Sequence, residues 1–135
     1  MLDIRLIREQ PDFVKERLTT RGGDDATKID ELLRVDTERR KAETALQQLN
    51  ADRKRLSKEI GGKRSRGESS NELEDQVREI GDQIALLNQQ TVERDEEQRN
   101  LLLNIPNLPH AAAPIGKEAK DNPVIRSWGE KPQLA

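Results

Sequence analysis

The sequence of residues 32–60, LLRVDTERRKAETALQQLNADRKRLSKEI, decides the fold. Alternating steps of three and four residues visit nine positions in it, and seven of these are apolar. The nine are Leu32, Val35, Arg39, Ala42, Leu46, Leu49, Arg53, Leu56 and Ile60. An apolar position every 3.5 residues is the pattern by which helices pack in coiled coils. The stretch therefore predicts one long helix with a single packing seam.

A second stretch repeats this pattern over the same length. Six of its nine positions are apolar, and the nine are Leu73, Val77, Ile80, Ile84, Leu87, Thr91, Arg94, Gln98 and Leu101. Residues 61–70 lie between the two stretches and contain three glycines, each of which costs about 1 kcal/mol inside a helix. Two equal seams joined by a short turn predict an antiparallel helical hairpin over residues 27–103, turning at about 61–70.

The polar positions of the seams indicate how the base of this hairpin is built. If Ile60 lies level with Leu73, Arg39 comes close to Arg94, and two like charges cannot share a dry core. We therefore expect either that the base of the hairpin is more hydrated, or that the two guanidinium groups reach outward to Glu43 or Glu97 while their stems cover the seam.

The flanking segments predict smaller elements. In residues 1–26, Asp3 can cap a first short helix, and Pro11 is suited to the first turn of a second. We expect these helices to pack at the base of the hairpin. Residues 104–135 contain scattered prolines and glycines, which predict an extended linker toward a catalytic domain outside this chain. The expected fold class is all-α, a two-helix coiled-coil hairpin with short N-terminal helices and an extended C-terminal linker.

The composition limits the functions to consider. Hydrophobic residues make up 32% of the chain and charged residues 37%, and the two aromatic residues are Phe13 and Trp128, so a thick core is not expected. The absence of cysteine excludes disulfides and thiolate metal sites, and a single histidine, His110, excludes a histidine cluster. No apolar run approaches the ~20 residues of a membrane span. We therefore expect no catalytic residue, no metal site, no membrane partner and a cytoplasmic location.

The positive charges are concentrated around the predicted turn. Residues 53–66 hold one acidic residue, Glu59, and seven basic ones: Arg53, Lys54, Arg55, Lys58, Lys63, Arg64 and Arg66. The whole chain has a net charge of −2, so the residues outside 53–66 are acidic, with 17 basic and 25 acidic side chains. Lysine and arginine can neutralise nucleic-acid phosphates. The same residues can equally form an ordinary solvated surface. We predict that these seven residues bind nucleic acid, although the seam position of Arg53 would point its side chain at the partner helix.

The two ends of the chain resemble a known family, the seryl-tRNA synthetases. The resemblance lies in Met1-Leu2-Asp3-Ile4-Arg5-Leu6-Ile7-Arg8-Glu9 with Pro11-Asp12-Phe13-Val14, in Leu56-Ser57-Lys58-Glu59-Ile60-Gly61, and in Asn104-Ile105-Pro106-Asn107-Leu108-Pro109-His110. Further matches are Pro114, Gly116-Lys117, Arg126 and Trp128-Gly129. The chain departs from the family at Ala111-Ala112-Ala113 and at Pro123, which affects the path of the linker more than the identity of the hairpin.

The resemblance implies a function that the residue patterns alone do not give. Members of this family are serine–tRNA ligases that use ATP and Mg, and their catalytic domain carries class II motifs that this chain lacks. The resemblance implies that residues 1–135 form the tRNA-binding arm, which grips the long variable arm and elbow of serine tRNA. It also implies a homodimer in which the arm of one subunit serves the active site of the other. We expect this chain alone to have no ligase activity and to bind no cofactor.

A second hypothesis remains open. A structural or protein-interaction coiled coil would explain the two seams and the scarcity of aromatic residues. It would not explain why seven basic residues gather at one end.

Overall fold

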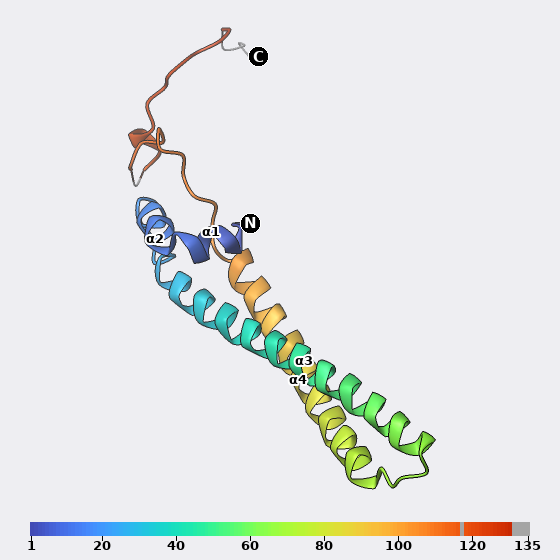
Figure 1. Cartoon of the computed structure of the whole chain (residues 1–135). Coiled ribbons are helices and arrows are strands. Elements are labelled where there is room, and N and C mark those ends of the chain that lie inside the picture. Colours follow the sequence, from blue (N-terminus) through green and yellow to red (C-terminus); the bar gives the residue numbers. More distant parts are fainter. Residues whose placement is uncertain (117, 131–135) are drawn as a thin grey trace, which may run out of the picture. The chain divides into compact units, whose positions relative to one another are not determined.

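The computed structural model of the protein describes residues 1–116 and 118–130. These contain four α-helices, namely α1 (Ile4–Glu9), α2 (Pro11–Thr19), α3 (Thr27–Ser65) and α4 (Asn71–Leu103), and a short 3-10 helix, η1 (Ala119–Asp121). No strand occurs in the described ranges. Helices α3 and α4 pack against each other and run in opposite directions (Figure 1). The predicted all-α fold with a long helical hairpin is confirmed.

The chain divides into two compact units, one of which joins residues 1–29 to the segment that begins at Pro106. In this unit the carboxylate of Asp3 caps α1 by accepting a hydrogen bond from the backbone N–H of Arg5 at 2.8 Å. Pro11 is the first residue of α2, where its missing N–H costs no helical hydrogen bond. Ile7, Val14 and Leu18 are fully buried. Both short helices therefore begin as the sequence predicts.

The segment that follows Pro106 is held to these helices by polar contacts. The guanidinium of Arg17 donates to the carbonyl of Pro109 at 2.8 Å, and that of Arg21 donates to the carbonyl of Asn107 at 3.3 Å. The N-terminal amine donates to Oδ1 of Asn107 at 3.2 Å. Residues 107–109, which the sequence assigns to a linker, thus belong structurally to the N-terminal unit. Lys117 and residues 131–135 of the expected linker lie outside the described residues.

The second unit, Asp30–Ile105, is the hairpin. Its buried apolar residues are Leu32, Val35, Leu56, Ile60, Ile84, Leu102 and Ile105. Other apolar seam positions are half-buried, as expected where two helices have no third layer to cover them, namely Ala42, Leu46, Leu49, Val77, Ile80 and Leu87. No helix among the described residues is long and apolar enough to cross a membrane.

Two predicted seam positions differ in the structure. Arg53 is exposed, because a long charged side chain can leave an apolar seam and keep its head in water. Leu101 is half-buried, and its neighbour Leu102 is buried in its place. A straight helix drifts by about 20° per heptad from a 3.5-residue repeat. Over the four heptads from Leu73 this drift amounts to almost one residue, which moves the seam from Leu101 to Leu102.

The predicted turn also begins too early. Helix α3 continues through Gly61 and Gly62 to Ser65, so the connection between the helices comprises residues 66–70 only. Gly67 ends the helix, because it has a positive φ of 72° and its N–H reaches back to the carbonyl of Arg64. The N–H of Glu68 donates to the carbonyl of Lys63 at 3.0 Å. These two hydrogen bonds and the left-handed glycine form a Schellman motif, a common helix C-cap.

Candidate nucleic-acid interface

The seven predicted binding residues lie at the end of α3 and in the connection to α4. Arg53, Lys54, Arg55, Lys58, Arg64 and Arg66 are exposed, and Lys63 is half-buried. The fold-back brings them next to the first turns of α4. Residues 68–82 hold six acidic side chains and one basic one. The turn end of the hairpin is therefore positive on α3 and negative on α4.

Three of the seven cations are neutralised locally. Arg64 pairs with Glu74 of α4 at 2.9 Å, Arg66 with Glu68 at 2.6 Å, and Arg55 with Asp52 at 3.4 Å. Arg66 and, more weakly, Lys63 hold the pKa of Glu68 below its ordinary value. The hydroxyl of Ser70 and then Arg64 lower the pKa of Glu74 in the same way. Both carboxylates are thus fully charged at neutral pH, and the pairs restrain the connection between the helices.

Four cations remain available to a ligand. Within residues 1–116 and 118–130, no ion pair involves Arg53, Lys54, Lys58 or Lys63. Lys54 and Lys58 are four residues apart, which places them on one face of α3. That face lies opposite Leu56 and Ile60, since a two-residue offset turns a helix by about 200°. These lysines therefore face away from α4.

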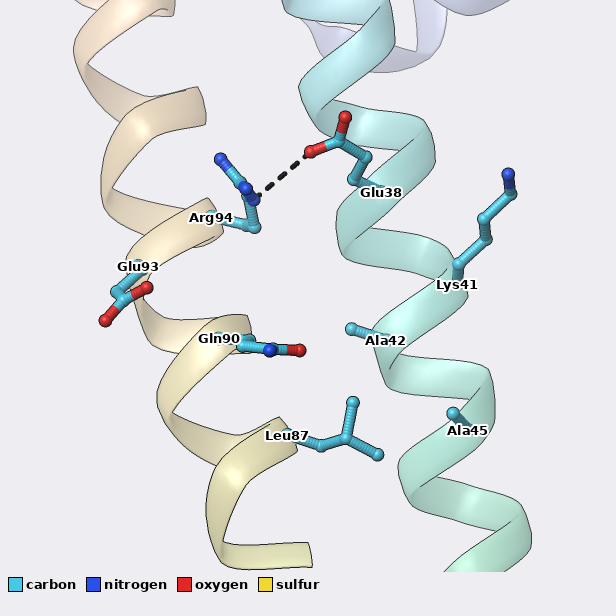
Figure 2. Close-up of a pocket in the computed structure, with 8 residues that line it drawn as sticks. All are labelled: Glu38, Lys41, Ala42, Ala45, Leu87, Gln90, Glu93 and Arg94. Atoms are coloured by element: carbon cyan, nitrogen blue, oxygen red, sulfur yellow. Dashed lines mark ion pairs between the residues drawn. The ribbon is translucent and has the colours of Figure 1, made fainter. Parts of the chain in front are cut away.

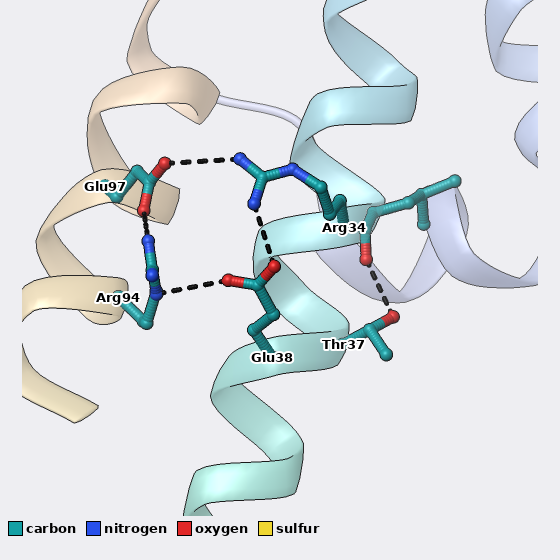
Figure 3. A network of polar contacts seen from close by, with 6 residues as sticks. Arg34, Thr37, Glu38, Arg94 and Glu97 are labelled. Carbon is teal, nitrogen blue, oxygen red and sulfur yellow. Dashed lines mark hydrogen bonds and ion pairs between the residues drawn. The ribbon is translucent and has the colours of Figure 1, made fainter. Parts of the chain in front are cut away.

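The other end of the hairpin is held by a network of ion pairs (Figure 3). Arg94 contacts Glu38 at 3.2 Å and hydrogen-bonds Glu97, while Arg34 contacts Glu38 at 2.8 Å and Glu97 at 3.7 Å. These carboxylates, Glu97 first, raise the pKa of Arg94.

Arg39 has carboxylate partners as well. It contacts Glu43 at 3.0 Å and Asp95 of α4 at 3.2 Å. The prediction that Arg39 and Arg94 reach Glu43 and Glu97 is confirmed. These arginines hold the two helices in register and are not available for phosphate.

A surface groove lies between α3 and α4. This groove has a volume of about 500 Å³. It lies beside the Arg94–Glu38 ion pair, and Ala42, Ala45 and Leu87 form part of its lining (Figure 2). No group of side chains among the described residues has the composition and spacing of a metal site. His110 is exposed, and its Nδ1 accepts a hydrogen bond from the N–H of Ala112 at 3.1 Å, which stabilises a local turn.

Comparison with known proteins identifies this architecture. Residues 1–109 match the family model of the seryl-tRNA synthetase N-terminal domain. The chain belongs to this family. It is 46% identical over 134 residues to the serine–tRNA ligase of Akkermansia muciniphila, covering 99% of this chain and 32% of that protein. The ligase of Chloroflexus aurantiacus is 43% identical over 134 residues and is covered to 31%. The chain thus spans about a third of the length of the curated relatives it matches.

Solved structures give the same assignment. The crystal structure of seryl-tRNA synthetase from Pyrococcus horikoshii complexed with ATP superposes with a TM-score of 0.87 at 38% identity, covering 96% of this chain and 29% of that one. The cytoplasmic ligase of Naegleria fowleri in complex with AMP superposes with a TM-score of 0.80 at 20% identity, covering 96% and 35%, and shows a shared fold. The seryl-tRNA synthetase resemblance seen in the sequence is confirmed.

Sequence reasoning missed one feature of the site, the acidic residues that α4 carries at the same end of the hairpin as the basic cluster of α3. Their spacing was visible, because Glu72, Asp75, Glu79 and Asp82 follow the same alternation of three and four residues as the seams. They are separate from residues 53–66 in the sequence, and the fold-back brings both groups to the turn end of the hairpin, on different helices.

Proposed function

We propose that this chain is the tRNA-binding arm of a serine–tRNA ligase, and that the turn end of its hairpin contacts the phosphates of a tRNA with a long variable arm. Family membership supports the link to this class of enzyme. One observation supports the contact between the turn end and tRNA phosphates. Four cations there form no ion pair among the described residues, namely Arg53, Lys54, Lys58 and Lys63. Charge on a rigid rod suits structured RNA, which proteins recognise mainly through its shape and backbone.

The wider role follows from the same family membership. We propose that the whole protein joins serine to its tRNA in an ATP- and Mg-dependent reaction, which a catalytic domain outside these residues performs in the cytoplasm. The arm holds the tRNA while its acceptor end is charged. In a homodimer, the arm of one subunit can serve the active site of the other. No residue of this chain is assigned a catalytic, ATP-binding or Mg-binding role.

A salt titration of tRNA binding tests the contact. The variant replaces Lys54, Lys58 and Lys63 by glutamine, which keeps helix propensity and breaks none of the ion pairs described above. Arg64 and Arg66 are left intact because they hold the connection between the helices. We expect weaker binding to a long-variable-arm tRNA. The slope of log K against log salt should shrink by about 0.7–0.9 for each phosphate that the variant no longer neutralises.

A matched control removes the same charge elsewhere. Arg5, Arg99 and Arg126 are exposed and form no ion pair in the part of the chain that the structure describes. Their replacement by glutamine should leave the slope unchanged. If the variant and the control bind the tRNA alike at every salt concentration, the lysines form only a solvated surface. A parent chain that binds no tRNA at low salt would favour the structural coiled coil instead.

A further inference from the structure

The outward side of α3 is positive over several turns. Alternating steps of four and three residues from Arg40 visit Thr44, Gln47, Ala51, Lys54 and Lys58, and all six side chains are exposed. Three of the six are basic and none is acidic. We call these six residues the α3 outer face. This face extends the basic surface of the turn end toward the middle of the hairpin. From Lys58 to Arg40 it spans about 27 Å, at a rise of 1.5 Å per residue.

The outward side of α4 has the opposite charge. The equivalent positions from its first turn are Glu72, Asp75, Glu79, Asp82, Leu86, Gln89 and Glu93, and all seven are exposed. Five are acidic and none is basic. Within the described residues one of the five, Asp75, forms an ion pair, with Arg78 at 3.4 Å. We call these seven residues the α4 outer face.

The two faces lie on opposite sides of the hairpin, because each is turned away from the seam that joins the helices. Lys54 and Lys58 are two residues from the buried Leu56 and Ile60, and Asp82 and Leu86 are two residues from the buried Ile84. A two-residue offset corresponds to about 200° of rotation. Two packed helices, each about 10 Å across, keep the faces about 20 Å apart. That distance exceeds the Debye length of about 8 Å at physiological salt, so neither face cancels the field of the other.

We infer that the α4 outer face excludes the nucleic-acid backbone, so that tRNA docks on the α3 outer face in a single rotational orientation. This inference rests on the proposed function and adds a determinant of specificity to it. An RNA that approaches α4 meets five carboxylates, and the resulting repulsion selects against wrong orientations and wrong partners. The same carboxylates reduce binding to RNA that lacks the shape to lie along α3. Arg40, outside the basic cluster of the turn, becomes part of the contact surface.

The first test removes the repulsion. The variant replaces Glu72 and Glu79 by glutamine and Asp75 and Asp82 by asparagine, leaving Glu74 and its pair with Arg64 intact. Its probe is a plain RNA duplex without a variable arm, measured beside the long-variable-arm tRNA. We expect duplex binding to tighten several-fold and tRNA binding to change less, so that the ratio of the two affinities falls.

The matched control changes four exposed acids that belong to neither face, replacing Glu9, Glu16 and Glu31 by glutamine and Asp12 by asparagine. It alters the net charge equally and should tighten duplex binding far less. Equal effects of variant and control would mean that net charge alone sets RNA affinity, which would overturn the inference. Circular dichroism checks that both variants keep the helicity of the parent.

The second test locates the RNA directly. The chain contains no cysteine, so a single introduced cysteine can carry a tethered hydroxyl-radical source without background. Ala51→Cys places it on the α3 outer face and Leu86→Cys on the α4 outer face, and neither change alters charge. We expect the bound tRNA to be cleaved from position 51 and not from position 86.

Two outcomes separate the inference from the proposed function. Equal cleavage from both positions, with tRNA bound, would overturn the single docking face and leave the tRNA-binding role intact. An unlabelled parent chain that fails to bind the tRNA at low salt would overturn both. Cleavage from position 86 that appears only when the four α4 acids are neutralised would support the repulsion itself.

Discussion

Asp36 is a carboxyl side chain only 2% exposed, and Gln98 of the facing helix donates its Nε2 to Oδ1 of Asp36 at 2.7 Å. Replacing Gln98 by alanine removes this hydrogen bond and the packing of the buried Gln98 side chain, which together cost about 1–3 kcal/mol. We expect the Gln98→Ala variant to lose that much free energy of unfolding in urea denaturation. The control is Gln83→Ala, because Gln83 is exposed and such changes stay within about 0.5 kcal/mol. Equal effects of the two substitutions would show that the hydrogen bond contributes nothing.

The sequence could predict one half of this contact. Gln98 falls on the second seam as a polar interruption, so its place between the helices followed from its spacing. Asp36 does not fall on the first seam, which passes through its neighbour Val35. A helix buries a stripe more than 100° wide, and that stripe takes in positions beside the strict 3.5-residue repeat. Spacing alone cannot say which polar neighbours are buried, because that depends on what covers them.

At the scale of the element, the three glycines near the turn have different roles. Gly61 and Gly62 lie inside α3, and an added Cβ meets nothing within 4 Å at Gly61 and only the Arg66 guanidinium at 3.7 Å at Gly62. Gly61→Ala and Gly62→Ala should each raise the free energy of unfolding by about 0.5–1 kcal/mol, because alanine loses less backbone entropy in a helix. Gly67→Ala should lower it by about 1–2 kcal/mol, because the left-handed conformation is strained for a side chain. Urea denaturation of the three variants gives these values.

The different positions of the three glycines explain why the predicted turn began too early. On a scale of helix propensity, each glycine destabilises a helix. The summed free-energy cost of the three glycines therefore predicted a turn at residues 61–70. In the structure Ile60 is buried and Lys63 half-buried, so packing carries α3 past the first two glycines. Tertiary contacts of this kind routinely override a cost of about 1 kcal/mol. Destabilisation by Gly61→Ala or Gly62→Ala would instead place these residues outside the helix.

At the scale of the whole molecule, charge is segregated between the two long helices. Within the bounds of α3 there are eleven basic and seven acidic residues, and within those of α4 three basic and nine acidic. The sequence alone shows that a basic cluster occurs in an acidic chain. It did not show that the compensating acids lie on the adjacent helix, because only the fold-back makes residues far apart in sequence into neighbours.

This segregation predicts that salt destabilises the hairpin. Opposite net charges on α3 and α4 attract, and four ion pairs cross between the helices: Arg34–Glu97, Glu38–Arg94, Arg39–Asp95 and Arg64–Glu74. All are partly exposed, so added salt screens them as the Debye length falls from about 10 Å at 0.1 M to about 3 Å at 1 M. We expect the midpoint of thermal unfolding, followed by circular dichroism, to fall by a few degrees as sodium chloride is raised over this range. The shift should be smaller in the Glu74→Gln variant, because one of the four ion pairs between the helices is then absent and cannot be screened. A midpoint that rises with salt in the parent would mean that repulsion among the α4 acids outweighs attraction between the helices.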